Sequence, residues 1–164
     1  MRHLSLSLSL SLSLAAGLLA ASALPAGTAI ASDGGDMPLS QLVRPFESEG
    51  VAVEADRKRQ RWEILLCQRN RVCNEIYVDP VSGRELRRER EFFSDPMPPE
   101  NGLTMSAIAE SLEQRQLGTI TELDFDSRRW EATIAPAQGS KFELHLDPVS
   151  GQIQRCRGRN CPSL

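Results

Sequence analysis

The chain has 164 residues, of which 40% are hydrophobic and 25% are charged, and its formal net charge is −3. So mild a charge argues against nucleic acid or an anionic membrane surface as a partner. Arg2 gives the N-terminus a positive charge, and residues 4–23 are uncharged Leu, Ser, Ala and Gly. This layout is typical of a secretory signal peptide.

A small-residue cleavage site of the A-x-A type ends at Ala31, so residues 1–31 are predicted to be the signal peptide. The segment 21–23 offers an alternative cleavage site. A retained membrane anchor is the rival interpretation, because about 20 uncharged residues can span a bilayer. Leu alternates with Ser over residues 4–14, however, and helix-breaking Pro and Gly follow. We therefore expect a cleaved, periplasmic or secreted protein without a membrane attachment.

A shift of 68 residues aligns the chain with itself. Twelve of the 34 positions from 50 to 83 are then identical, where average composition gives roughly two. The two tryptophans, Trp62 and Trp130, fall on each other, which indicates an internal duplication with both side chains in the core. Four carboxylates also recur: Glu54 with Glu122, Asp56 with Asp124, Glu63 with Glu131, and Glu75 with Glu143.

Each copy is predicted to start with a helix. The first covers residues 38–49 with Gly50 as its stop and is shortened or kinked by Pro45, and the second covers 104–117 with Gly118 as its stop. Runs of period-two alternation follow each helix and predict half-buried antiparallel hairpins.

The sequence Asp-Pro-Val-Ser-Gly ends the hairpin region of both copies. It fits a type I turn, with the aspartate as acceptor at the first position and the glycine in the left-handed conformation that follows. We therefore predict structural roles for Asp79, Gly83, Asp147 and Gly151.

The predicted fold class is α+β, with two tandem copies of a helix packed on a three- to four-stranded antiparallel sheet. Because each unit is small, the copies are expected to pack on each other. The predicted divisions are the first unit at 37–91, a linker at 92–103, the second unit at 104–155 and a tail at 156–164.

The repeated order of helix, Gly, Glu-rich strand, Trp-Glu strand and Asp-Pro-x-Ser-Gly resembles the PepSY domain, here at residues 38–88 and 104–155. The resemblance implies a secreted or envelope module of the helix-on-sheet type. Such modules occur in the propeptides of thermolysin-like metalloproteases and in small exported bacterial proteins, and peptidase inhibition has been proposed for the family. The family carries no catalytic residue set, and no H-E-x-x-H sequence follows here.

The four cysteines are predicted to form two local disulfides. Cys67 and Cys73 lie directly opposite each other if their hairpin pairs residues whose numbers sum to 140, and Cys156 and Cys161 enclose a short loop. A zinc site and a redox pair are the alternatives. The C-x5-C and C-x4-C spacings differ from the C-x2-C of those sites.

The sequence offers little for catalysis. His145 is the one histidine of the expected mature chain, and its counterpart in the first copy is Tyr77, so we predict an exposed strand residue. No nucleophile motif, phosphate loop or paired-histidine spacing accompanies it. We expect no enzyme, no cofactor and no metal ligands.

These features predict a non-enzymatic PepSY-like binding or regulatory module that acts by contact with another protein. The partner considered is an envelope peptidase, which this contact would inhibit. The candidate interaction surface is the outer sheet face at Glu63, Leu65, Glu75 and Tyr77. The alternative is an envelope carrier or sensor of a small ligand or metal ion, bound in a cleft between the copies by the recurrent carboxylates.

Overall fold

The computed structural model describes residues 35–162, so the predicted signal peptide lies outside the described residues. The helical segments are α1 (Leu39–Val43), the 3-10 turn η1 (Phe46–Ser48) and α2 (Met105–Gln114). The strands are β1 (Val51–Arg57), β2 (Trp62–Cys67), β3 (Val72–Val78), β4 (Glu85–Phe92), β5 (Thr119–Asp126), β6 (Arg129–Ala135), β7 (Phe142–Leu146) and β8 (Ile153–Arg157). Within residues 35–162, no helix combines the length and the apolar character needed to cross a membrane.

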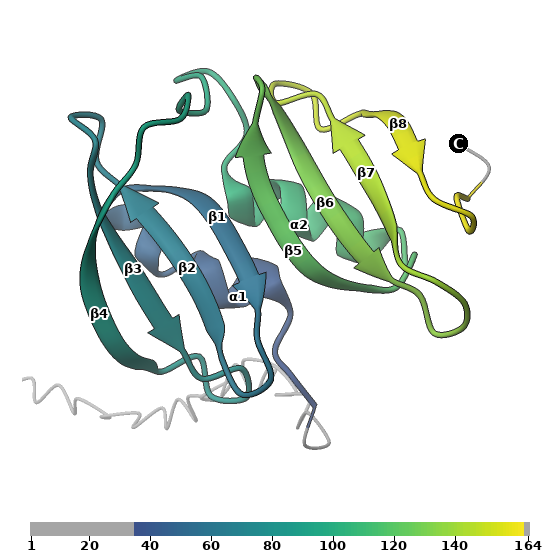
Figure 1. Cartoon of the computed structure of the whole chain (residues 1–164), viewed down its shortest axis with the longest axis horizontal. Helices are drawn as coiled ribbons and strands as arrows, with labels where there is room; N and C mark the ends of the chain where they lie inside the picture. Colours follow the sequence, from purple (N-terminus) through teal and green to yellow (C-terminus); the bar gives the residue numbers. More distant parts are fainter. Residues whose placement is uncertain (1–34, 163–164) are drawn as a thin grey trace, which may run out of the picture. The chain divides into compact units, whose positions relative to one another are not determined.

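The strands form a single antiparallel sheet of eight in the order β4-β3-β2-β1-β5-β6-β7-β8 (Figure 1). The prediction of an α+β fold with two tandem helix-on-sheet units is therefore wrong, because β1 pairs with β5 and merges the two expected sheets into one. The described chain is mostly β, with one helix of ten residues and another of only five. A separate sheet in each copy would expose the unpaired backbone of β1 and β5, and their pairing satisfies both edges.

Both helices are shorter than predicted. Pro45 lacks the N–H that would continue α1, and the chain passes into η1 instead. Thr104 caps α2, since its side-chain oxygen accepts a hydrogen bond from the N–H of Ala107.

Gly118 has a φ of +143° just beyond α2, and a Cβ there would lie 2.5 Å from the carbonyl oxygen of Ala135. Gly118 is therefore required by its close approach to Ala135. The prediction that it stops the second helix is wrong, because α2 ends at Gln114 and the left-handed residue that follows is Gln116, with a φ of +53°.

One hydrophobic core lies between the sheet and the two helices, which cover the same face of it (Figure 1). Trp62 is 2% exposed and Trp130 is fully buried, so the predicted core role of the tryptophan pair is confirmed. The helices contribute Leu42, Ile108 and other apolar residues to this core. Residues of both copies share the core, as expected for units that are only marginally stable alone.

A second, smaller apolar cluster joins the Cys67–Cys73 disulfide to Val53, Leu65 and Phe93. Phe93 belongs to the segment predicted to be a linker, yet it is only 8% exposed. The start of that segment therefore packs against the sheet.

The seam between β1 and β5 is centred on a pair of equivalent residues. Ala55 pairs with Leu123, and these two positions correspond in the 68-residue repeat. A local two-fold axis therefore passes through this pair. Features encoded once in each copy are brought together on the two sides of the seam.

Each helix start is held by a glutamate from the other copy. The backbone N–H and hydroxyl of Ser106 donate to Glu47 at 2.8 and 2.6 Å, and those of Ser40 donate to Glu113 at 3.1 and 2.5 Å. Both serines are buried. The negative charges also lie where the helix dipoles favour them, so these contacts stabilise both helices and the joint between the copies.

The repeated turns have the predicted structure. Oδ1 of Asp79 accepts from the N–H of Ser82 at 2.7 Å, Oδ1 of Asp147 accepts from that of Ser150 at 2.8 Å, and these and neighbouring hydrogen bonds lower the pKa of both carboxyls. The two following glycines, Gly83 and Gly151, have φ values of +69° and +68°.

The turns also support the chain entering each helix. The carbonyl of Pro80 accepts from the N–H of Met37, and that of Pro148 accepts from the N–H of Leu103, both at 2.7 Å. This second role links the turn to the helix start and is not evident from the turn sequence.

Replacing Glu113 by Ala should lower the free energy of unfolding by about 2 kcal/mol, because two charge-assisted hydrogen bonds to the buried Ser40 are lost. Urea denaturation measures this. Glu110→Ala is the matched control, since its partner Arg44 lies in an exposed ion pair, and it should cost less than about 1 kcal/mol. Equal losses of stability in the two variants would contradict the proposed strength of the hydrogen bonds between Ser40 and Glu113.

Candidate functional site

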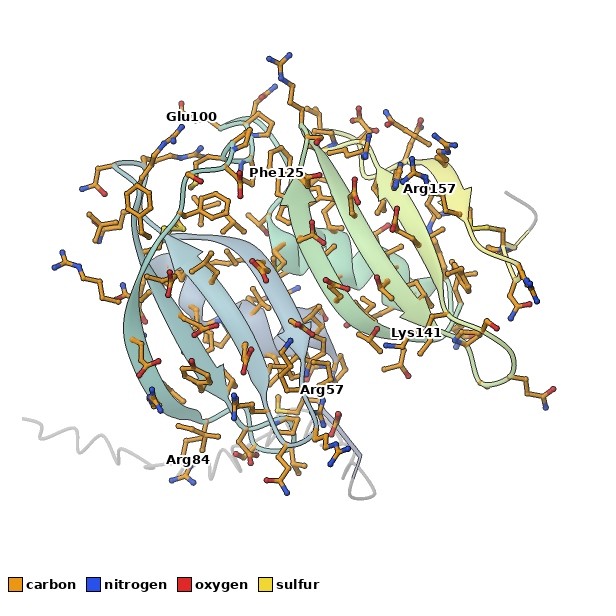
Figure 2. The ribbon with its side chains drawn as sticks, viewed as in Figure 1. Arg57, Arg84, Glu100, Phe125, Lys141 and Arg157 are labelled. Carbon is orange, nitrogen blue, oxygen red and sulfur yellow. A yellow bond between two sulfur atoms is a disulfide. The ribbon has the colours of Figure 1, made fainter. Side chains whose placement is uncertain are left out.

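The face of the sheet that carries no helix has a group of carboxylates at its centre (Figure 2). Side chains alternate along a strand, so the residues on either side of the buried Ala55 and Leu123 point to this open face. The repeat provides two acidic residues from each copy: Glu54 and Asp56 from β1, and Glu122 and Asp124 from β5. The two-fold relation therefore doubles the acidic charge at the seam.

Two adjoining hollows of about 340 and 300 Å³ lie on the open face, and Glu54 lines both. The first is lined by Glu54, Glu122, Asp124, Glu131, Thr133 and Glu143, and the second by Glu54, Glu63, Leu65, Glu75, Glu91, Phe92, Phe93 and Asp95. We call these residues together the acidic groove. Nine of them are Asp or Glu and none is Lys or Arg, which makes the groove a surface for cationic groups.

The carboxylates of the groove differ in how they are neutralised. Glu63 forms an ion pair with Arg61, and Glu131 forms one with Arg129, each at 2.5 Å. Within residues 35–162, by contrast, no ion pair joins the seam carboxylates that line the first hollow: Glu54, Glu122 and Asp124. Glu75, Glu91 and Asp95 of the second hollow also lack an ion pair in this range, so among the nine groove carboxylates only Glu63, Glu131 and Glu143 are ion-paired.

Burial, together with the neighbouring charges of Glu122 and Glu131, raises the pKa of Asp124 to about 7. Burial also raises the pKa of Glu54, and the charge of Asp56 adds to this effect. Ionisation of these two carboxyls therefore costs free energy in the folded protein. A bound cation would remove that cost.

The two copies differ at the position that could have neutralised Asp124. In the first copy, the ammonium of Lys58 contacts Asp56. The residue equivalent to Lys58 in the second copy is Asp126, which adds to the repulsion. The seam is thus symmetric in its carboxylates and asymmetric in its counter-charges.

Three of the four residues predicted as an interaction surface, Glu63, Leu65 and Glu75, line the acidic groove. Tyr77 does not line it. Its ring lies between the guanidinium groups of Arg61 and Arg87, at 4.8 and 5.2 Å from the ring centroid. Its hydroxyl is hydrogen-bonded to Glu75. Tyr77 therefore stabilises the surface beside the groove.

Both predicted disulfides are present, Cys67–Cys73 and Cys156–Cys161. Cys67 pairs directly with Cys73 across the β2–β3 hairpin, so the predicted register is also confirmed. The first disulfide lies under Phe93, at one end of the groove.

The prediction that His145 is exposed is wrong, because its side chain is only 3% exposed although it lies on a strand with an open face. Its Nε2 donates a hydrogen bond to Oε1 of Glu143 at 2.5 Å and lies 3.8 Å from Oε1 of Glu131. In the register of the sheet, Arg155 of β8 lies opposite it. Its neighbours on this face include carboxylates of β6 and β7, contacts that the alternation along β7 alone does not predict.

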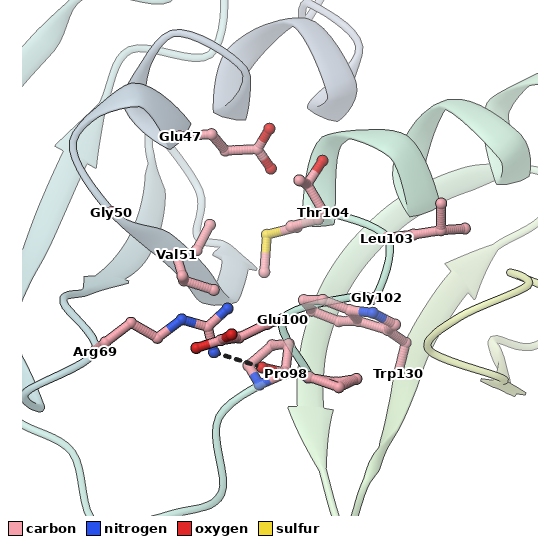
Figure 3. Close-up of a pocket in the computed structure, with 13 residues that line it drawn as sticks. Glu47, Gly50, Val51, Arg69, Pro98, Glu100, Gly102, Leu103, Thr104 and Trp130 are labelled. Atoms are coloured by element: carbon pink, nitrogen blue, oxygen red, sulfur yellow. Dashed lines mark hydrogen bonds between the residues drawn. The ribbon is translucent and has the colours of Figure 1, made fainter.

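A further pocket of about 170 Å³ lies against the buried ring of Trp130 (Figure 3). Two of its charged side chains already have partners. The guanidinium of Arg69 donates to the carbonyl of Pro98 at 2.7 Å, and Glu47 accepts from Ser106.

A hollow of about 470 Å³ beside Trp62 is larger than the groove hollows, but its charged residues are also partnered, Asp36 with Arg57 and Glu113 with Ser40. The groove is the better candidate site because its seam carboxylates have no ion pair among the described residues.

No protein-family model matches the sequence, and no curated protein matches it. The fold has a weak similarity to the crystal structure of a protein described as a "putative lipoprotein" from Clostridium difficile 630, with 12% sequence identity and a TM-score of 0.46. The match covers 77% of this chain and 95% of that chain. At this level of similarity, neither family nor function transfers.

Replacing Asp124 by Asn should stabilise the protein at pH 8. The carboxyl has an ordinary pKa of 3.8 when unfolded and one of about 7 when folded, so folding is penalised once the pH rises through this interval. Discounted for partial solvent screening, the gain is about 1–2 kcal/mol at pH 8 and close to zero at pH 4. Urea denaturation at both pH values measures it.

Asp126→Asn is the matched control, because it removes the same charge from an exposed position of the same strand. It should change stability by less than about 0.5 kcal/mol at either pH. A loss of stability in Asp124→Asn at pH 8 would show that the carboxylate makes favourable contacts that outweigh the repulsion.

Proposed function

We propose that the protein is an exported, non-catalytic binding module whose acidic groove binds a basic segment of a partner protein. The observation that supports this most directly is the composition of the groove, which has nine carboxylates and no lysine or arginine among its lining residues. A partner of opposite charge gains from this field both in its rate of association and in its specificity.

The centre of the groove supports a cationic occupant on energetic grounds. Glu54, Glu122 and Asp124 come together without an ion pair in the part of the chain that the structure describes, and the pKa values of Glu54 and Asp124 are raised. A lysine or arginine placed among them relieves their mutual repulsion. Its contribution exceeds that of an isolated surface pair, since the carboxylates are partly desolvated.

The β4 end of the groove offers an apolar contact. Phe92 is 80% exposed, an unusual state for a large aromatic side chain, and it lines the second hollow beside Leu65 and Phe93. The fitting partner segment is therefore one that combines basic residues with an apolar or aromatic anchor. Anchors of this kind supply much of the affinity in protein interfaces.

Export is supported by the predicted signal peptide and by the two disulfides, which form and persist in oxidising compartments. The resemblance of both copies to PepSY domains agrees with an envelope or secreted module and places peptidases among the candidate partners. A peptidase partner would present its basic segment to the groove. The absence of a recognised catalytic motif in the sequence supports binding rather than chemistry.

A fluorescently labelled peptide of alternating Lys, Arg and Phe is a suitable probe, with binding followed by fluorescence anisotropy at low salt. Combining Glu54→Gln with Glu122→Gln should weaken binding at least tenfold, since two charge contacts of about 0.7 kcal/mol each are lost. Affinity should also fall as salt is added.

The matched control combines Glu100→Gln with Glu110→Gln, which removes the same charge outside the groove. It should leave the affinity within about twofold of the wild type, because distant exposed charges are screened. Equal weakening by the two double variants, or equal binding of a peptide with Glu in place of Lys and Arg, would rule out the groove as the site.

A further inference from the structure

At the edge of the acidic groove, the lining residues Glu131 and Glu143 form a cluster with His145, and the three potential ligand atoms all lie within 4.8 Å of one another. His145 is the buried member, at 3% exposure, and its Nε2 points at the two carboxylates. The glutamate side chains are 17% and 35% exposed, so the cluster can be reached from solvent.

The imidazole alone does not satisfy both carboxylates. The Nε2 atom of an imidazole carries at most one proton, and the hydrogen bond to Glu143 at 2.5 Å uses it. Oε1 of Glu131 lies 3.8 Å from the same nitrogen, beyond hydrogen-bond distance. Two carboxylate oxygens thus converge on one nitrogen that can serve only one of them.

The spacing of these atoms suits a small divalent cation. Zinc binds histidine nitrogen and carboxylate oxygen at about 2.0–2.2 Å, which places tetrahedral ligand atoms about 3.3 Å apart. The distances of 2.5 and 3.8 Å from Nε2 to the two oxygens lie on either side of this value. Side-chain shifts of less than about 1 Å would bring all three atoms to coordinating distance.

Two arginines now occupy the outer side of the cluster. Arg129 lies 2.5 Å from Oε1 of Glu131, and Arg157 lies 3.5 Å from Oε1 of Glu143. Their charges oppose the entry of a cation, and they also hold both carboxylates in place. The site should therefore bind metal reversibly, and removing Arg129 should strengthen binding.

The first copy provides an internal comparison. It keeps both carboxylates, as Glu63 and Glu75, but Tyr77 stands where the second copy has His145. The arginines that flank the tyrosine ring, Arg61 and Arg87, correspond to Arg129 and Arg155. The second copy thus adds an imidazole to a carboxylate arrangement common to both.

We propose that Glu131, Glu143 and His145 bind a divalent transition-metal cation, with zinc as the representative ion. Three protein ligands leave one position of a tetrahedral zinc ion open, which is typical of zinc sites that bind water or another exchangeable ligand. The histidine favours zinc over calcium, because imidazole nitrogen is a poor ligand for calcium. This inference does not depend on a protein partner.

Isothermal titration of the metal-free, disulfide-bonded protein with zinc chloride tests the site. The wild type should bind one zinc ion, and an excess of calcium should not displace it. His145→Tyr should weaken zinc binding at least tenfold, and the fold should accept tyrosine because the equivalent Tyr77 is accommodated between two arginines. Glu131→Gln should weaken binding as well, and Arg129→Gln should strengthen it several-fold.

Glu54→Gln is the control for general attraction of cations, because Glu54 lines the groove but does not belong to the cluster. It should leave zinc affinity within about twofold of the wild type. Circular dichroism shows whether each variant is folded. If His145→Tyr does not fold, the zinc affinity of Glu131→Gln still tests the site. Equal zinc binding by wild type and the folded cluster variants, or displacement by calcium, would overturn the proposal.

The zinc proposal and the peptide proposal can be disproved independently of each other. Combining Glu54→Gln with Glu122→Gln should weaken the basic peptide and leave zinc binding unchanged. His145→Tyr should do the reverse, because His145 does not line the groove.

Discussion

The pairing of β1 with β5 is the contact on which the rest of the structure depends. It covers only three residue pairs, centred on Ala55 and Leu123, yet it joins two four-stranded halves into one sheet. The two copies then share a core, and each supplies the glutamate that holds the other's helix start. Because the paired strands are antiparallel and equivalent, every residue near the axis meets a counterpart from the other copy.

The same pairing creates the electrostatic strain of the open face. Ala55 and Leu123 are fully buried on one side of the sheet, and the acidic residues beside them are carried to the other side. Burial of the apolar pair stabilises the seam, while repulsion among the carboxylates opposes it. Natural proteins tolerate such conflicts between local charge and fold mainly at functional sites. At the seam, a bound cation would therefore stabilise the fold by relieving the repulsion among the carboxylates.

Local signals made much of this fold predictable. Period-two alternation and turn chemistry act over a few residues, so the hairpin register at Cys67 and Cys73, the turn at Asp147 and the burial of Trp130 followed from the sequence. Alternation predicts which face of the sheet a side chain occupies. It does not predict which strand pairs with an edge strand, so the pairing of β1 with β5 could not be predicted from it. The environment of His145 could not be predicted for a related reason, since its contact with Glu131 comes from a neighbouring strand, β6.

The seam gathers carboxylates without neutralising them, and the titration of Asp124 tests this most directly. Its carboxyl carbon can be followed by ¹³C NMR over pH 3 to 9 in protein labelled at aspartate. A midpoint near 7 that falls when a basic peptide is added is the expected result. A midpoint at the ordinary value of 3.8, unchanged by peptide, would contradict the claim.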